Sequence, residues 1–152
     1  MLKQLVLITA LGTAAILSGC ESMPSSSATT AQNLQLLQNR TWIATQIGNT
    51  EIKTAPSDRN IPSIQLDEAT KRVSGADGCN RIMGPYNATA DQLSFGPLAG
   101  SQMACLNNDN IDQKYNEALR KVTHYQVFGK TLKLLDRNGN LLIQYQSAVQ
   151  PR

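Results

Sequence analysis

The stretch Leu132–Gln146, LKLLDRNGNLLIQYQ, carries the clearest local structural signal in the chain. Two apolar, β-compatible segments, LKLLD and NLLIQYQ, flank the pair Asn138-Gly139. An Asn-Gly pair between such segments is typical of a tight hairpin, because a type I′ turn needs positive φ at both of its central residues. We therefore predict a C-terminal antiparallel hairpin with a type I′ turn at Asn138-Gly139.

The segments upstream of this hairpin are short, and most of them have the composition of strands. Gly129-Lys130 is expected to join two of them in a further hairpin. Pro62 is expected to place the start of another strand at a sheet edge or in a loop. The predicted strands cover residues 42–47, 61–66, the region of Val73, 82–86, 92–95, 124–128 and 131–135.

One segment shows helical periodicity. Its apolar residues fall at i, i+4, i+7, i+8 and i+11, on one face of a helix: Ile111, Tyr115, Ala118, Leu119 and Val122. Asp109 or Asn110 is expected to cap the start of this helix. Many short strands and one late helix predict an α+β fold, mostly antiparallel β, with the helix covering an open side of the sheet.

Length and charge narrow the function classes. The chain has 152 residues, which fits a single domain, and 14 Lys and Arg against 11 Asp and Glu. The excess of positive charge is small and scattered along the sequence, whereas a nucleic-acid-binding protein normally has a basic stripe. We therefore expect no nucleic-acid partner.

The N-terminus has the pattern of an export signal. The apolar run Leu5–Leu17 would span about 20 Å as a helix, short of the roughly 30 Å hydrocarbon core of a membrane. The following Leu17-Ser18-Gly19-Cys20 resembles the lipobox of bacterial lipoproteins, in which the signal is cut before the cysteine and the thiol is lipidated. We predict a signal peptide at 1–19 and lipidation, palmitate included, at Cys20. The alternative is an ordinary signal peptide with an incidental cysteine.

The segment after Cys20 is predicted to be a flexible tether. Residues 20–32 are rich in Ser, Thr and Ala and have almost no apolar bulk, so they gain little from ordering. The alternative is that the segment packs as part of the domain, which we place at 33–148. The resemblance to bacterial lipoproteins, in which Asp after the cysteine favours the inner membrane, implies with Glu21 at that position an outer-membrane location, with the domain facing the periplasm.

Cys79 and Cys105 remain as a candidate pair. In an oxidising periplasm, two thiols in a small domain usually form a disulfide. Two free buried thiols are a second interpretation. A zinc site with His124 is a third, but the ligands lack the paired spacing that zinc sites have.

The order of short motifs resembles a known family. Gly78-Cys79-Asn80, then Gly84-Pro85-Tyr86, Leu93-Ser94-Phe95 and Met103-Ala104-Cys105, followed by a helix and a terminal hairpin, resemble the META domain, and most of all HslJ-like bacterial heat-shock lipoproteins. The resemblance covers roughly 36–145. It implies an incomplete small barrel packed on one α-helix, in which Gly78, Asn80, Met103 and Ala104 belong to a structural motif. It further implies a role in the envelope, in stress or novobiocin tolerance.

No catalytic pattern accompanies these motifs. His124 is the only imidazole in the chain, and the sequence has no Gly-x-Ser-x-Gly, Walker or dinucleotide-binding motif. We expect a non-enzymatic protein without metal or cofactor, whose partners are the membrane, through its lipid, and an envelope protein or hydrophobic ligand. The functional alternatives are a carrier of a lipid or hydrophobic small molecule in the barrel, and an inhibitor or pilot protein that binds an envelope protein.

Overall fold

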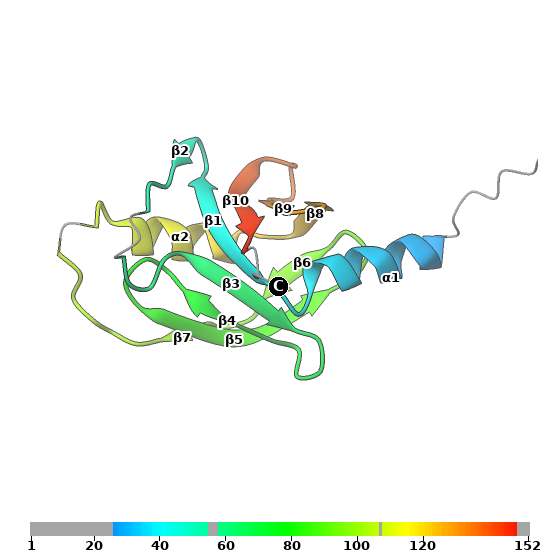
Figure 1. Cartoon of the computed structure of the whole chain (residues 1–152), viewed down its shortest axis with the longest axis horizontal. Coiled ribbons are helices and arrows are strands. Elements are labelled where there is room, and N and C mark those ends of the chain that lie inside the picture. Colours follow the sequence, from blue (N-terminus) through cyan, green and yellow to red (C-terminus); the bar gives the residue numbers. More distant parts are fainter. Residues whose placement is uncertain (1–25, 55–57, 107, 149–152) are drawn as a thin grey trace, which may run out of the picture.

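The computed structural model of the protein describes residues 26–54, 58–106 and 108–148 (Figure 1). This part of the chain forms two helices and ten strands. In chain order they are α1 (Ser26–Leu37), β1 (Thr41–Ile47), β2 (Thr50–Glu51), β3 (Ser63–Asp67), β4 (Arg72–Ala76), β5 (Arg81–Ala88), β6 (Leu93–Phe95), β7 (Ala99–Gly100), α2 (Ile111–Arg120), β8 (His124–Phe128), β9 (Thr131–Leu135) and β10 (Leu141–Ser147).

The strands form an antiparallel sheet that curls into a nearly closed barrel. Its order is β6-β5-β4-β3-β1-β10-β9-β8, with β2 beside β1 and β7 beside β5. The end strands meet at an isolated bridge between Gln92 and His124, next to a hydrogen bond from Leu93 N to Thr123 O (3.1 Å). Beyond this bridge they separate and leave one unsealed seam in the described barrel. The predicted α+β fold with an incomplete small barrel is confirmed.

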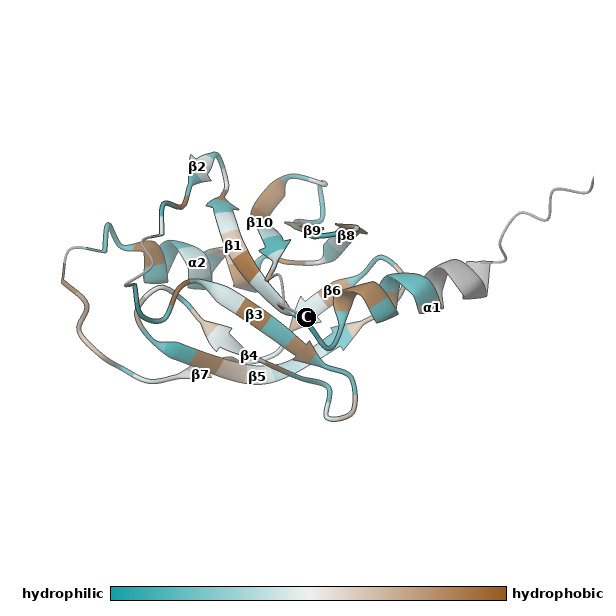
Figure 2. Cartoon of the chain, viewed as in Figure 1, coloured by the Kyte–Doolittle hydropathy of each residue, from teal (hydrophilic) through white to brown (hydrophobic). Residues whose placement is uncertain are grey.

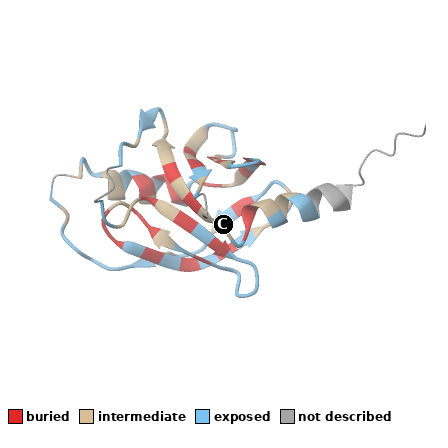
Figure 3. Ribbon diagram, viewed as in Figure 1, coloured by how far each residue is buried: buried red, intermediate tan, exposed pale blue. Residues whose placement is uncertain are grey.

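The barrel interior is filled by large side chains. Buried residues alternate with exposed or half-buried ones along β3, β5 and β8 (Figure 3), and along β3 the hydropathy alternates as well (Figure 2). α2 packs against β1, β6 and β10, and its buried residues are Tyr115, Ala118 and Leu119. The largest fully buried side chains are Trp42, Tyr115, Tyr145, Leu37, Ile64, Leu66, Leu93, Leu119, Leu132, Leu134, Ile143 and Val73.

All four tyrosines of the chain are protected from ionisation by the fold. Burial raises the pKa of Tyr125 to about 12, and it also raises the pKa values of Tyr86, Tyr115 and Tyr145. The hydroxyls of Tyr115 and Tyr145 share a hydrogen bond of 2.9 Å in the core. Because the folded pKa values lie above the unfolded value of about 10, the folded state holds these protons more tightly.

We therefore expect the free energy of unfolding to fall as the pH rises from about 10 to about 12. Phenolate absorbance of the native protein should appear above pH 10, together with unfolding, whereas the urea-unfolded protein should titrate near 10. Native tyrosines that all ionise near pH 10 without loss of stability would contradict the buried arrangement.

The C-terminal hairpin is present, but its predicted type I′ turn is wrong. Gly139 has φ 80°, whereas Asn138 is not among the residues with positive φ. Gly139 N donates to Asp136 O (3.0 Å), and the Asp136 carboxylate accepts from the backbone N–H groups of Asn138 (2.8 Å) and Asn140 (2.9 Å). The aspartate thus stabilises a longer turn in which only the glycine needs positive φ.

The expectation of a single helix is also wrong, because α1 precedes the barrel (Figure 1). Residues 26–32 fall in this helix rather than in a flexible tether, while 20–25 lie outside the described residues. The helix is held at its C-terminal end: Leu37 is fully buried, Trp42 Nε1 donates to Leu37 O (2.9 Å), and Asn33 Nδ2 donates to Ala90 O (3.0 Å). Once that end is fixed, a run without Pro or Gly extends the helix readily. Neither described helix has the length and apolar character needed to cross a bilayer.

α2 has the predicted position but not the predicted cap. Asp109 and Asn110 both adopt left-handed backbone conformations (φ 52° and 55°), and the Asn110 side chain makes no capping bond. Asn108 contributes instead: its carbonyl oxygen accepts from Ile111 N (3.0 Å), and its Nδ2 donates to Asp112 Oδ1 (2.9 Å). The start of α2 is therefore fixed by Asn108, the residue before the predicted capping residues Asp109 and Asn110.

Candidate functional site

A cleft of about 570 Å³ lies along the unsealed seam of the barrel. One wall is the edge formed by β6, β7 and the residues after them, and the other wall is α2. We call it the seam cleft. Its lining residues are Asp77, Asn80, Ile82, Phe95, Gly96, Pro97, Leu98, Gly100, Ser101, Gln102, Asp112, Gln113, Asn116, Glu117, Leu119 and Arg120.

Asp77 is the buried polar residue at the base of the seam cleft, 3% exposed. One carboxylate oxygen, Oδ1, accepts hydrogen bonds from the backbone N–H groups of Cys79 (3.0 Å) and Asn80 (2.7 Å). The other, Oδ2, accepts from Asn116 Nδ2 on α2 (2.7 Å). The carboxylate thus joins the turn between β4 and β5 to the helix.

Asn80 performs the corresponding role for the loop after β7. Its Oδ1 accepts from Met103 N (2.7 Å) and from Ser101 Oγ (3.2 Å). Ser101 Oγ also accepts from Arg81 N (3.2 Å). The amide of Asn80 therefore holds the rim of the seam cleft against the first residues of β5.

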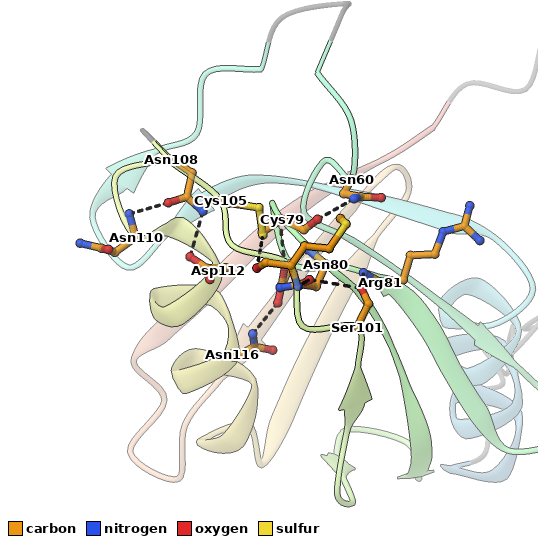
Figure 4. Close-up of a disulfide and its surroundings, with 12 residues drawn as sticks. Asn60, Cys79, Asn80, Arg81, Ser101, Cys105, Asn108, Asn110, Asp112 and Asn116 are labelled. Carbon is orange, nitrogen blue, oxygen red and sulfur yellow. Dashed lines mark hydrogen bonds between the residues drawn. A yellow bond between two sulfur atoms is a disulfide. The ribbon is translucent and has the colours of Figure 1, made fainter.

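A disulfide between Cys79 and Cys105 covalently joins the same two segments (Figure 4). Their Cα atoms lie 5.8 Å apart, within the normal range for a disulfide. Cys79 is buried and Cys105 is half-buried. The main-chain oxygen of Cys79 accepts from Asn60 Nδ2 (2.5 Å), so the segment before β3 is attached as well.

Gly78 occupies a position where a side chain does not fit. Its φ is 102°, and a Cβ atom there would lie 2.5 Å from Ile111 Cγ2 and 3.3 Å from Pro62 Cγ. We expect Gly78→Ala to lower the free energy of unfolding by about 2 to 3 kcal/mol, because backbone strain and a contact with α2 add together. Urea unfolding followed by circular dichroism measures this.

The matched control is Gly129→Ala, because Gly129 also has positive φ (56°) but no atom within 4 Å of the added Cβ. Because only backbone strain acts at this position, we expect Gly129→Ala to lower the free energy of unfolding by about 1 kcal/mol, less than Gly78→Ala does. Equal losses in the two variants would show that the contact with Ile111 is unimportant.

The predicted site residues are partly brought together by this arrangement. Asn80 bonds to Met103, and Gly78 forms the turn next to the disulfide, whereas the side chains of Met103 (54% exposed) and Ala104 face solvent. Cys20 lies outside the described residues.

His124, the possible zinc ligand, lies at the bridge between the two ends of the barrel sheet. Its Nδ1 shares a hydrogen bond of 2.9 Å with Thr123 Oγ1, and it takes part in the bridge to Gln92. Within residues 26–54, 58–106 and 108–148, no three His, Cys, Asp or Glu side chains are grouped as metal ligands.

Sequence reasoning missed Asp77 and Asn116, the two residues that connect the turn to α2. Asp77 precedes Gly78, an Asp-Gly pair that favours a turn, so a turn signal was present. Its burial was not predictable, because Asn116 meets it only after the helix has packed on the barrel.

The seam cleft carries an acidic surplus. Asp77, Asp112 and Glu117 line it with a single cation, Arg120, on a chain whose formal charge is +3. Lys121 forms an exposed ion pair with Glu117 (2.7 Å), and its hydrogen bond lowers the pKa of the Glu117 carboxyl. An exposed pair of this kind is weak, so Glu117 remains open to other cations.

The seam cleft and a second cleft both leave out the large aromatic side chains at the centre of the barrel. A second cleft, of about 440 Å³, lies between the segment from Thr50 to Ile61 and the start of α2. Neither it nor the seam cleft is lined by Trp42 or Tyr145, which fill the barrel core. The seam cleft is the larger of the two, and charged and amide side chains make up much of its lining.

Comparison with known proteins identifies relatives of this fold. A solved protein from Burkholderia xenovorans is similar over 95% of this chain and 100% of its own, with 26% identity and a TM-score of 0.57. A DUF4847 family protein from Bacteroides vulgatus, 17% identical, covers 77% of this chain and 98% of its own with a TM-score of 0.56, and it supports the fold alone. No curated protein matches the sequence. The META domain family model matches residues 13–149, nearly the whole chain, and the chain therefore belongs to the META domain family.

Proposed function

We propose that the protein is a non-enzymatic lipoprotein of the outer membrane that supports the envelope under stress, by binding an envelope protein. Lipidation at Cys20 attaches it to the membrane, and the barrel faces the periplasm. The family membership and the lipobox-like Leu17-Ser18-Gly19-Cys20 support this proposal.

The observation that carries it is the contrast between a filled barrel and a polar cleft. The core is occupied by Trp42, Tyr115 and Tyr145, which argues against a lipid or hydrophobic small molecule carried inside the barrel. The seam cleft, in contrast, presents charged and amide side chains on a surface that the disulfide holds in place. A protein partner therefore fits this surface better than the carried ligand that was our alternative.

The disulfide is consistent with the proposed compartment. Disulfides persist in the periplasm and are rare in the cytosol. Cys79–Cys105 joins two segments of the cleft rim, so export would be needed for a complete site. An inhibitor or pilot function is a special case of the same proposal, in which the partner is a hydrolase or a secretion component.

Deletion and complementation in the native host test the proposal. The deletion strain should lose tolerance of heat or novobiocin, and the wild-type gene should restore it. Cys20→Ala should fail to restore it although the protein folds, because the domain no longer remains at the membrane. A deletion strain with unchanged tolerance, or full rescue by Cys20→Ala, would contradict the proposed role.

A further inference from the structure

The two short strands at the seam form one interrupted strand along β5. The register pairs Tyr86 with Phe95 in β6 and Ile82 with Gly100 in β7. Between these pairs the β6–β7 side contains one more residue than β5, which is a bulge centred on Pro97. Gly84 lies opposite it, where a Cβ atom would approach Pro97 O to 2.6 Å.

This register determines where the backbone groups of the seam edge point. Gly96 N donates to Pro85 O (2.9 Å), and Ser101 N donates to Arg81 O (3.1 Å), both on β5. In an antiparallel pair, successive residues alternate between bonding the partner strand and facing away from it. The residue next to each donor therefore presents its N–H and C=O groups on the opposite side.

Those neighbouring residues are Phe95 and Gly100, and both line the seam cleft. Within the described part of the chain, neither backbone has a hydrogen-bond partner on the side away from β5. They are separated by about 16 Å of extended chain. The seam edge therefore has unused strand-pairing capacity along a cleft of about 570 Å³.

The opposite wall indicates what that chain would carry. Gln113 and Glu117 on α2 are exposed, and Asp112 lies beside them. Acidic side chains that face an open strand edge favour an added strand with cationic side chains, and disfavour an acidic one. The open strand edge thus favours an extended chain, and the acidic wall favours cationic side chains on that chain.

We propose that the seam cleft binds an extended, Lys- or Arg-bearing segment of a partner protein, which adds to β6–β7 as a strand and places its cations against Asp112 and Glu117. This inference rests on the proposed function, because it specifies how an envelope protein would be held. Main-chain pairing supplies affinity in such complexes, and the side-chain contacts supply specificity.

A displayed library of random heptapeptides, panned on the lipidated protein in detergent micelles, tests the charge preference. Enriched peptides should be rich in Lys and Arg, and Glu117→Lys should weaken their binding about tenfold or more, equivalent to about 1.4 kcal/mol. The matched control is Glu51→Lys, which makes the same charge change at an exposed site in β2, outside the seam cleft. No enrichment, an acidic or neutral consensus, or equal losses in the two variants would overturn the proposal.

Amide hydrogen exchange measured by NMR tests the strand addition. Binding of an enriched peptide should slow exchange at Phe95 and Gly100 at least tenfold, because their N–H groups acquire partners. A peptide that binds without protecting either amide would overturn the pairing. If tolerance depends on the gene while no peptide binds, the proposed function stands and this inference fails. If peptides bind as described while deletion has no phenotype, this inference stands and the proposed function fails.

Discussion

Replacement of both cysteines, Cys79→Ala with Cys105→Ala, is expected to lower the free energy of unfolding by about 3 to 4 kcal/mol. The crosslink joins positions 26 residues apart, and a loop of that length accounts for roughly 3.5 kcal/mol of chain entropy in the unfolded state. Urea unfolding of the oxidised protein and of the double variant, both followed by tryptophan fluorescence, gives the difference directly.

Reductant provides the internal control for this prediction. It should destabilise the wild-type protein by a similar amount and leave the double variant unchanged, because that variant lacks the Cys79–Cys105 crosslink. A wild-type protein whose stability does not respond to reductant would show that Cys79 and Cys105 are not joined in solution.

Asp77→Ala is expected to lower the free energy of unfolding by about 3 to 5 kcal/mol. The substitution removes the acceptor of three hydrogen bonds, and the donors on Cys79, Asn80 and Asn116 lie in buried or partly buried surroundings. Each buried donor left without a partner costs about 1 to 3 kcal/mol, and water entering from the cleft reduces the total. Thermal and urea unfolding both measure the change.

Asp77→Asn is the matched control, because it keeps the shape of the side chain. The amide oxygen still accepts from Cys79 and Asn80, and the Asn116 amide has only to turn over to present its oxygen. We expect a loss of about 1 to 2 kcal/mol. If Asn and Ala cost the same, hydrogen bonding by this carboxylate is not what holds the turn to α2.

Much of the barrel was predictable because its strands and helix are strongly periodic. The segments 124–128 and 131–135 match β8 and β9. The apolar stripe predicted a helix from Ile111 to Val122, and α2 begins at Ile111 and ends two residues earlier, at Arg120. Each of these elements buries one face against the same core, so local pattern and tertiary packing agree.

The features that were missed depend on contacts that form only in the folded chain. α1 has a polar composition and is fixed by the buried Leu37, by the bond from Trp42 Nε1 to Leu37 O, and by the bond from Asn33 to Ala90 O. β7 is two residues long and pairs with β5 only past the bulge at Pro97. The turn near Asn138 is set by the Asp136 carboxylate, which accepts from the backbone N–H groups of Asn138 and Asn140. The Asn-Gly pair alone does not indicate these bonds.

The candidate site was predictable only in outline. The family resemblance indicated the motif residues Gly78 and Asn80, whose role is to hold the rim of the seam cleft. The seam itself arises because β6 is short and approaches β8 at its N-terminal end, through the bridge from Gln92 to His124 and the bond from Leu93 N to Thr123 O. Which two strands remain unpaired depends on how the whole sheet closes, so a local sequence pattern does not predict the position of the seam.

Radiolabelled palmitate incorporation, followed by density-gradient separation of the two membranes, tests the central claim most directly. We predict label on the wild-type protein in the outer-membrane fraction, and no label after Cys20→Ala. Full-length, unlabelled wild-type protein in the cytosolic fraction would contradict the account, since the lipid anchor and the periplasmic partner would both be lost.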